Sequence, residues 1–155
     1  TGLDSTHDSY LLEIAAVIPA TNDTVLWLRC GDSGGIDDGA DTYRFHTSHA
    51  TSEATGYGTA VISGNTTRID ISGQGVGNVS GKGYGASIVL GRPGDSSVDP
   101  LFHGTYAFLS TNSSPRGGFI IGHRTSAITL DRVQILFASG NIAEGRLTVW
   151  GYKHT

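Results

Sequence analysis

Hydrophobic residues recur at every second position over many short stretches of this chain. A period of two is typical of β-strands, whose side chains point alternately to the two faces of a sheet. Residues 101–109 are the clearest case, because Phe102, Tyr106 and Phe108 share one parity. We find no segment with the 3.6-residue period of an amphipathic helix. The pattern therefore predicts an all-β protein of about ten short strands, with no significant helix.

Turn-forming residues separate the apolar stretches and set their limits. Strands are predicted over residues 10–18, 24–30, 42–47, 59–62, 67–72, 86–90, 101–109, 119–122, 127–130, 132–138 and 145–152. Residues 10–18 also admit a helix, which Pro19 would soon end. Residues 73–83 are rich in glycine and predict a loop. The polar turn Ser139–Asn141 predicts that the last two strands form a closing hairpin.

Composition agrees with one β domain spanning residues 1–155. The 23 glycines follow no collagen-like period and lie between the apolar stretches, as the turns of a β-sandwich require. Parallel βαβ architecture is disfavoured because crossover helices are missing. We therefore expect an antiparallel β-sandwich. A chain that begins without Met is expected to be processed or excised from a longer protein.

Charge and cysteine content exclude several classes of function. The net charge is −4 and the ten basic residues form no cluster, which argues against nucleic-acid binding. No apolar stretch approaches the ~20 residues that span a membrane. The single cysteine, Cys30, alternates with Leu26 and Leu28, so we expect a buried side chain and neither a disulfide nor a structural zinc site.

Three segments resemble bacteriophage fibre and spike receptor-binding domains of the jelly-roll type. They are Tyr10–Ile14 with Pro19–Asn22 and Leu26–Arg29, Gly31–Gly35 with Asp41–Arg44, and the ending Phe137–Tyr152. Residues 47–83 carry no such likeness. The resemblance implies a jelly-roll sandwich at the C-terminal tip or head of a longer fibre protein. It also implies a homotrimer on the virion surface, held to other virion proteins through a missing N-terminal part and binding a host-cell glycan.

The sequence of several strands favours contact with another subunit. Apolar residues occur on both parities of these strands, and an oligomer can cover both faces where a monomer cannot. The candidates for a subunit interface or for the core are Trp27, Leu136, Trp150 and Tyr152.

Glycan binding requires an aromatic ring against the apolar face of a sugar, with polar side chains for its hydroxyl groups. Tyr57 and Tyr84 flank glycine-rich segments and are the candidate rings. Arg92, Asn112 and Arg116 lie in predicted turns and are the candidate polar contacts. Substitution of either tyrosine by alanine is expected to weaken binding to cells.

Evidence for other chemistry in the sequence is weak. An acidic loop has the oxygen ligands that calcium needs, but not EF-hand spacing: Asp32, Asp37, Asp38 and Asp41. His46 and His49 fall on opposite faces of a strand, so we expect no shared metal. A glycosidase needs two carboxylates about 5–10 Å apart, and the sequence pairs none of its candidates. These candidates are Glu53, Asp95, Asp99 and Glu144.

These observations favour a domain without enzymatic activity, cofactor or metal that attaches a virion to a host surface polysaccharide. Membrane insertion and nucleic-acid partners are not expected. Three alternatives stay open at this point: a decoration or assembly domain without a receptor, a cellular carbohydrate-binding module, and a glycan depolymerase.

Overall fold

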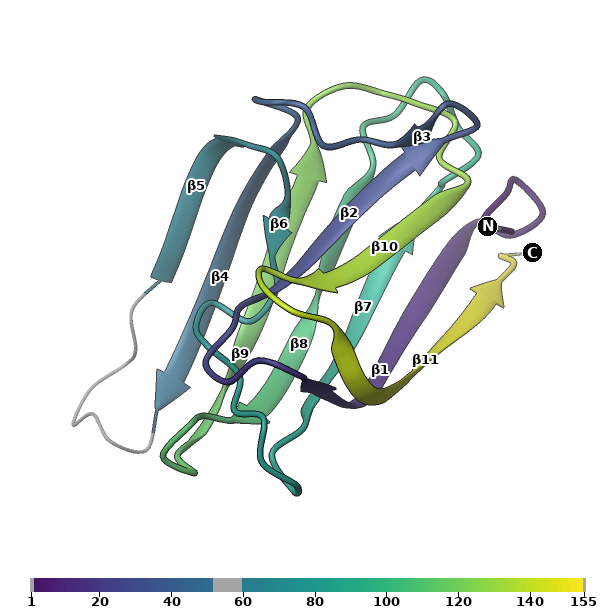
Figure 1. Ribbon diagram of the computed structural model, residues 1–155. Coiled ribbons are helices and arrows are strands. Elements are labelled where there is room, and N and C mark those ends of the chain that lie inside the picture. The colour runs from purple at the N-terminus through teal and green to yellow at the C-terminus, as the bar shows by residue number, and fades with distance from the viewer. Residues whose placement is uncertain (1, 52–59, 155) are drawn as a thin grey trace.

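The computed structural model describes residues 2–51 and 60–154 and contains eleven strands and no helix there (Figure 1). The strands are β1 (Ser9–Pro19), β2 (Leu26–Asp32), β3 (Gly35–Ile36), β4 (Tyr43–Thr51), β5 (Ala60–Thr66), β6 (Ile69–Asp70), β7 (Tyr84–Gly91), β8 (Leu101–Leu109), β9 (Pro115–Arg124), β10 (Arg132–Phe137) and β11 (Ile142–Tyr152). No helix in the described ranges is long and apolar enough to cross a bilayer. The prediction of an all-β fold is confirmed.

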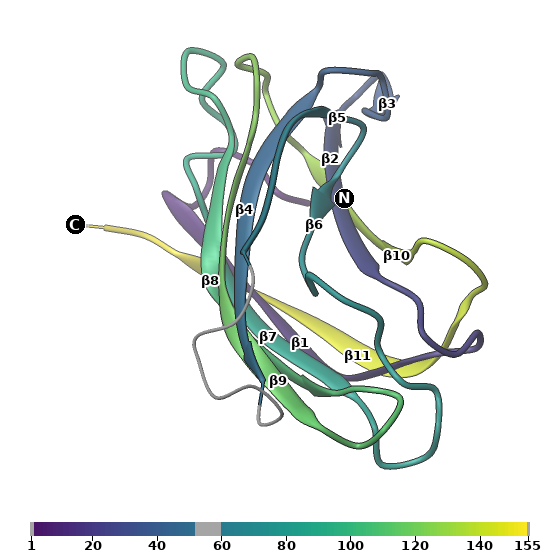
Figure 2. The same ribbon diagram turned by 90° about the vertical axis from the view of Figure 1, so that its left-hand side faces the viewer.

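All strand pairs are antiparallel and form two unequal sheets. The large sheet has seven strands in the order β11-β1-β7-β8-β9-β4-β5. The small sheet has the order β10-β2-β3, and β6 also pairs with β2. Figure 2 shows the sheets as two layers, with β2, β6 and β10 facing the large sheet. The architecture is a β-sandwich, and the jelly-roll assignment within it stays a prediction.

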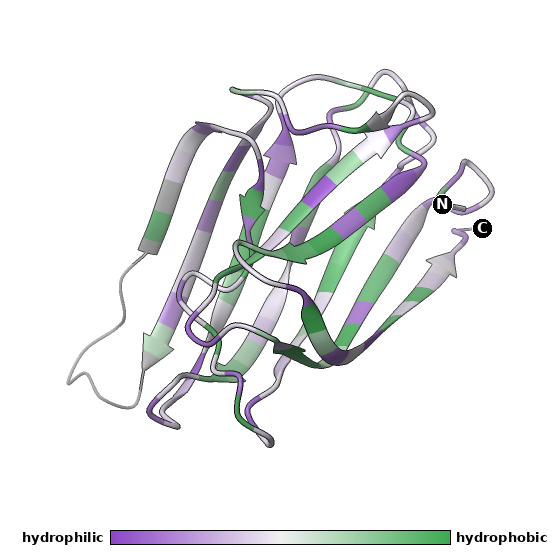
Figure 3. Ribbon diagram, in the orientation of Figure 1, coloured by the Kyte–Doolittle hydropathy of each residue, from purple (hydrophilic) through white to green (hydrophobic). Residues whose placement is uncertain are grey.

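The alternation of side chains produces the core between the layers. Along β7, buried and half-buried residues alternate over all eight positions. Alternating green and purple bands follow β2 and β10 in Figure 3. One cluster unites apolar side chains from both sheets, among them Leu12, Leu28, Ile88 and Phe102, each fully buried. Cys30 belongs to this cluster, as expected, and burial raises the pKa of its thiol to about 12.

One predicted strand and one predicted strand pairing were wrong. Residues 127–130 form no strand, although Leu130 is fully buried. The predicted closing hairpin does not exist, because β10 pairs with β2 in the small sheet and β11 pairs with β1 in the large one. Gly140, with a φ of 72°, lies in the turn that carries the chain from one sheet to the other. A polar turn between two strands does not determine whether they pair with each other.

A buried tyrosine links the two sheets. Tyr43 of β4 is fully buried, and its hydroxyl reaches β2. It accepts the N–H of Cys30 at 2.9 Å and shares its own hydrogen with the carbonyl oxygens of Cys30 and Asp37, both at 2.9 Å. Burial raises the pKa of this tyrosine well above its ordinary value. The link fixes the position of β2, whose outer face is described next.

Candidate functional site

The structure contradicts one of the two aromatic candidates for glycan binding. Tyr84 is fully buried on β7, its ring stacks on Tyr106 at 5.7 Å between centroids, and its hydroxyl donates to the carbonyl of Ile71 at 2.6 Å. The prediction that Tyr84 is an exposed sugar platform was therefore wrong, because strand alternation turns its side chain into the core. Tyr57 lies outside the described residues.

The three polar candidates do not form one site. Arg92 follows β7 and pairs with Asp95 at 2.5 Å. Asn112 lies in the turn between β8 and β9, where its side chain accepts a hydrogen bond from Ser110, and Arg116 is on β9. The nine residues of β8 separate Arg92 from the other two, which at about 3.3 Å per residue is close to 30 Å.

The candidate metal ligands are not gathered either. Asp37 pairs with Arg124 at 2.7 Å, and the carboxylate of Asp32 accepts the N–H of Gly34 at 2.7 Å. No group of three or more potential metal ligands exists among the residues that the structure describes. On β4, His49 is buried on the inner face while His46 lies on the outer face, which confirms that the two point to opposite sides.

The interface and core candidates divide between the two sheets. Trp150 and Tyr152 lie on β11 with 56% and 48% of their surface exposed, so the interpretation of these two as core residues was wrong. Trp27 and Leu136 are opposite each other on β2 and β10, half-buried on the outer face of the small sheet. A role of any of the four in a subunit interface stays a prediction.

A surface that the sequence did not suggest surrounds Trp27. On β2, Leu26 and Leu28 point inward, so Trp27 and Arg29 point outward. β6 pairs Ile69 with Leu28, and the same register places Arg68 opposite Arg29. We call Trp27, Arg29, Arg68 and Gln134 the Trp27 surface; Gln134 is the exposed neighbour of Arg29 on β10.

Both arginines lie over the Trp27 indole. The guanidinium carbon of Arg68 is 4.1 Å from the ring centroid and that of Arg29 is 5.9 Å away. These are cation–π distances, worth about 0.5–1 kcal/mol at exposed sites. The Nε of Arg29 donates to the carbonyl of Thr67 at 3.0 Å, which holds this guanidinium against the sheet. The arrangement fixes two planar cations beside one aromatic ring.

Within the described residues, neither arginine of this surface forms an ion pair with a carboxylate. The buried Nε of Arg68 also has no hydrogen-bond acceptor there. Like charges at directly opposed positions of a sheet are destabilising. Asp70, which follows Ile69 on β6, is buried, and its carboxylate accepts the N–H groups of Ser72 and Gly73. Burial raises the pKa of Asp70, while the charge of Arg68 acts to lower it. An anion bound between the two guanidinium groups would relieve the repulsion.

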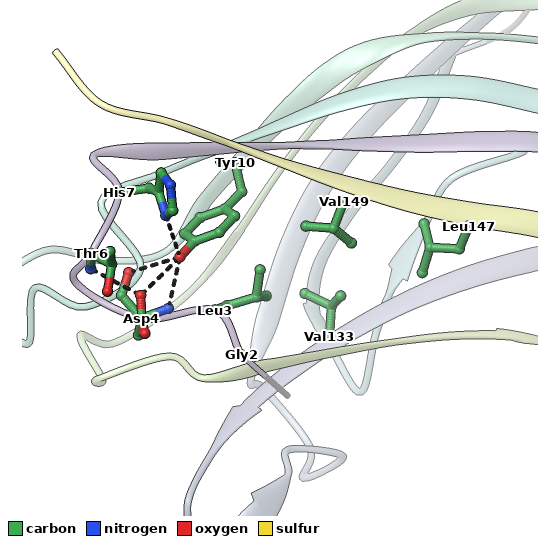
Figure 4. A pocket seen from close by; sticks show the side chains of 10 residues that line it. Gly2, Leu3, Asp4, Thr6, His7, Tyr10, Val133, Leu147 and Val149 are labelled. Atoms are coloured by element: carbon green, nitrogen blue, oxygen red, sulfur yellow. Dashed lines mark hydrogen bonds between the residues drawn. The ribbon is translucent and has the colours of Figure 1, made fainter.

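A groove of about 430 Å³ lies between the two sheets, where Val133 of β10 is near Leu147 and Val149 of β11 (Figure 4). Leu3, Val133, Leu147 and Val149 give it an apolar wall. At one end the hydroxyl of Tyr10 donates to Asp4 at 3.0 Å, next to His7 and Thr6. Hydrogen bonds from Thr6 lower the pKa of Asp4. With its polar end already hydrogen-bonded, the groove fits an apolar side chain better than a sugar.

A second, polar pocket of about 330 Å³ adjoins this groove and contains Arg92. Two carboxylates, Asp8 and Asp95, also line it. Hydrogen bonds from Ser97 lower the pKa of Asp95, and Asp8 accepts the N–H of His154 at 2.7 Å. A glycosidase needs one carboxyl group with a raised pKa as its general acid. Because the pKa of Asp95 is lowered, its carboxyl group lacks the property that a general acid in this pocket would need.

Comparisons with known proteins do not assign a function to this chain. No family model, no curated protein and no solved structure matches this chain. The Trp27 surface is therefore our candidate site.

Proposed function

We propose that this chain is a non-enzymatic attachment domain that binds an anionic glycan on a cell surface through the Trp27 surface. The observation that carries the proposal is the pair of arginines that lie opposite each other over one indole, with no ion pair to a carboxylate among the described residues. The phage-fibre setting rests on the sequence resemblance alone. Within that setting the domain is a virion protein that contacts the host.

The chemistry of the surface suits a sugar acid. A guanidinium group binds a carboxylate or sulfate through two parallel hydrogen bonds, which a neutral hydroxyl cannot reproduce. The indole offers an apolar edge for the C–H groups of a sugar ring, and the exposed amide of Gln134 is available to hydroxyl groups. Because the surface lies on an open sheet face, it fits a repeating polysaccharide and not an enclosed small molecule.

A single open site of this kind binds weakly. Attachment therefore depends on several copies acting together, since linked sites gain 10²–10⁴-fold in avidity without new contacts. An oligomer on a fibre, and many fibres on a particle, supply those copies. The competing assembly function without a receptor has its own support in the exposed apolar residues of β11, which are considered below.

Binding to immobilised polysaccharides tests the proposal. Labelled domain is applied to polygalacturonate, to heparin and to neutral dextran, and retention is measured at increasing salt. We expect retention on at least one of the anionic polymers, none on dextran, and a decrease with salt. Trp27→Ala and Arg68→Gln should each reduce retention about tenfold, which corresponds to about 1.4 kcal/mol.

Arg44→Gln is the matched control, because Arg44 is exposed on β4 and lies in the large sheet, outside the Trp27 surface. Thermal unfolding of each variant shows whether it is folded. Retention that is equal on dextran, or that Trp27→Ala and Arg68→Gln leave unchanged, would refute the proposed site.

A further inference from the structure

The last strand is the most exposed strand of the sandwich. β11 lies at the edge of the large sheet and pairs with β1 alone among the described strands. Ten of its eleven residues are exposed. Five of these are large apolar or aromatic residues with 42–56% of their surface in solvent: Ile142, Leu147, Val149, Trp150 and Tyr152. Both faces contribute, since Leu147 and Val149 line the groove while Trp150 points to the outer face of the sheet.

The register shifts of β11 against β1 are confined to its first residues, and from Arg146 to Tyr152 the edge is regular and without lysine or proline. Natural edges are short or carry lysine or proline. β11 is eleven residues long and contains neither. Its only charged side chains, Glu144 and Arg146, have opposite sign. The carbonyl of Tyr152 accepts a bond from Asp8, on the side of β1, so by the alternation of the ladder the backbone groups of Leu147 and Val149 point to the open edge.

We propose that β11 pairs antiparallel with β11 of a second copy of this chain, about a two-fold axis at Thr148. Thr148 then lies opposite Thr148 of the other copy, and Leu147 lies opposite Val149 on the groove side. On the outer face Arg146 lies opposite Trp150. Threonine pairs and apolar pairs are favourable cross-strand neighbours, and an arginine beside a tryptophan adds a cation–π contact. This register opposes no like charges.

The exposed area is close to what a stable dimer needs. The five apolar and aromatic side chains offer on the order of 500 Å² per copy, or about 1,000 Å² in total, before the backbone edge is counted. Specific interfaces begin near this size. The hydrogen bonds of the ladder add to it, since pairing satisfies the unpaired groups of both edges.

The pairing also joins the two grooves. Leu147 and Val149 form the wall of the groove at its open edge (Figure 4), and in the dimer the same residues of the second copy continue this wall. The two-fold arrangement differs from the trimer implied by the sequence resemblance. It also stands apart from the glycan proposal, because the Trp27 surface lies on the other sheet.

Light scattering on the purified chain and on two matched variants tests the inference. We expect the wild type to have twice the 16.2 kDa chain mass at high concentration. Val149→Lys places a charge on the edge and should give the monomer mass. Val79→Lys is the control, because Val79 is 55% exposed and outside β11. A monomer or a trimer for the wild type would overturn the pairing, as would a dimer that persists in Val149→Lys.

A cysteine at the axis gives a second test that does not rely on disrupting the strand. Opposed residues without mutual hydrogen bonds have Cα atoms about 4.5 Å apart, within reach of a disulfide. Thr148→Cys should therefore form a covalent dimer on mild oxidation. Thr105→Cys, an exposed threonine in the middle of the same sheet, should not. Equal cross-linking of the two variants, or none in Thr148→Cys, would refute the register.

Discussion

Removal of one buried hydroxyl should measure how firmly the two sheets are held together. In Tyr43→Phe the ring stays in place, but the N–H of Cys30 loses the acceptor that it has at 2.9 Å. Cys30 is fully buried, so water cannot replace that acceptor. The carbonyl of Cys30 keeps a partner, because it also accepts the N–H of Asp37 at 2.9 Å.

The expected loss of stability follows from these hydrogen bonds. A buried donor without a partner costs about 1–3 kcal/mol, and the loss of the hydroxyl's own hydrogen bond adds about 1 kcal/mol. We therefore expect Tyr43→Phe to lower the free energy of unfolding by about 2–4 kcal/mol. With a urea slope of roughly 2 kcal/mol/M, the unfolding midpoint falls by about 1–2 M.

Urea unfolding followed by tryptophan fluorescence is the assay. Tyr152→Phe is the control, because its side chain is 48% exposed and should change stability by no more than about 0.5 kcal/mol. If Tyr43→Phe were as stable as Tyr152→Phe, the hydroxyl of Tyr43 would not link β4 to β2 as described.

Three further predictions concern stability. Burial, and to a smaller extent the charge of Arg116, lower the pKa of His49. The unfolded chain therefore binds the proton more readily, and the stability of the fold should decrease as the pH drops below about 6.5. In His49→Gln, the melting temperature should depend less on pH between about pH 7 and 5. Burial raises the pKa of Asp70, so its ionised form is penalised and the folded state loses stability as the pH rises through that pKa. Asp70→Asn should therefore raise the melting temperature at pH 7 by a few degrees, and a gain that does not shrink at pH 4 would contradict this cause. A Cβ at Gly122 would lie 2.8 Å from side-chain carbons of the buried Ile69, so Gly122→Ala should cost about 1–3 kcal/mol in urea unfolding, and an unchanged midpoint would argue against that close packing.

The positions of the strands could be predicted from the sequence because strand alternation is a local property. Residues 101–109 and 132–138 agree with β8 and β10 to within a residue. The burial of Cys30 followed from the same alternation. Pairing between strands is not local, however. Nothing in residues 132–152 indicates that β10 joins β2 while β11 joins β1, which is why the hairpin prediction failed.

The candidate site was harder to predict for the same reason. Trp27 and Arg29 were visible as outward neighbours on one strand, but Arg68 is distant in sequence and reaches the indole only through the pairing of β6 with β2. The prediction for Tyr84 failed because the neighbouring glycine-rich segment was taken to imply an exposed side chain. Tyr84 is the first residue of β7, and its side chain already points into the core. The parity of Tyr84 with Ala86 and Ile88 was a signal that could have placed it in the core.

The central claim is that an anionic sugar binds at Trp27, and the two tryptophans of the chain allow a direct test. Each indole N–H gives one peak in a ¹H–¹⁵N correlation spectrum, and Trp27→Ala identifies which peak is which. The chain is titrated with the oligosaccharide of the polymer that retains it most strongly. We predict that the Trp27 peak moves in a saturable way while the Trp150 peak stays in place. Movement of the Trp150 peak alone, or of neither peak, would contradict the account.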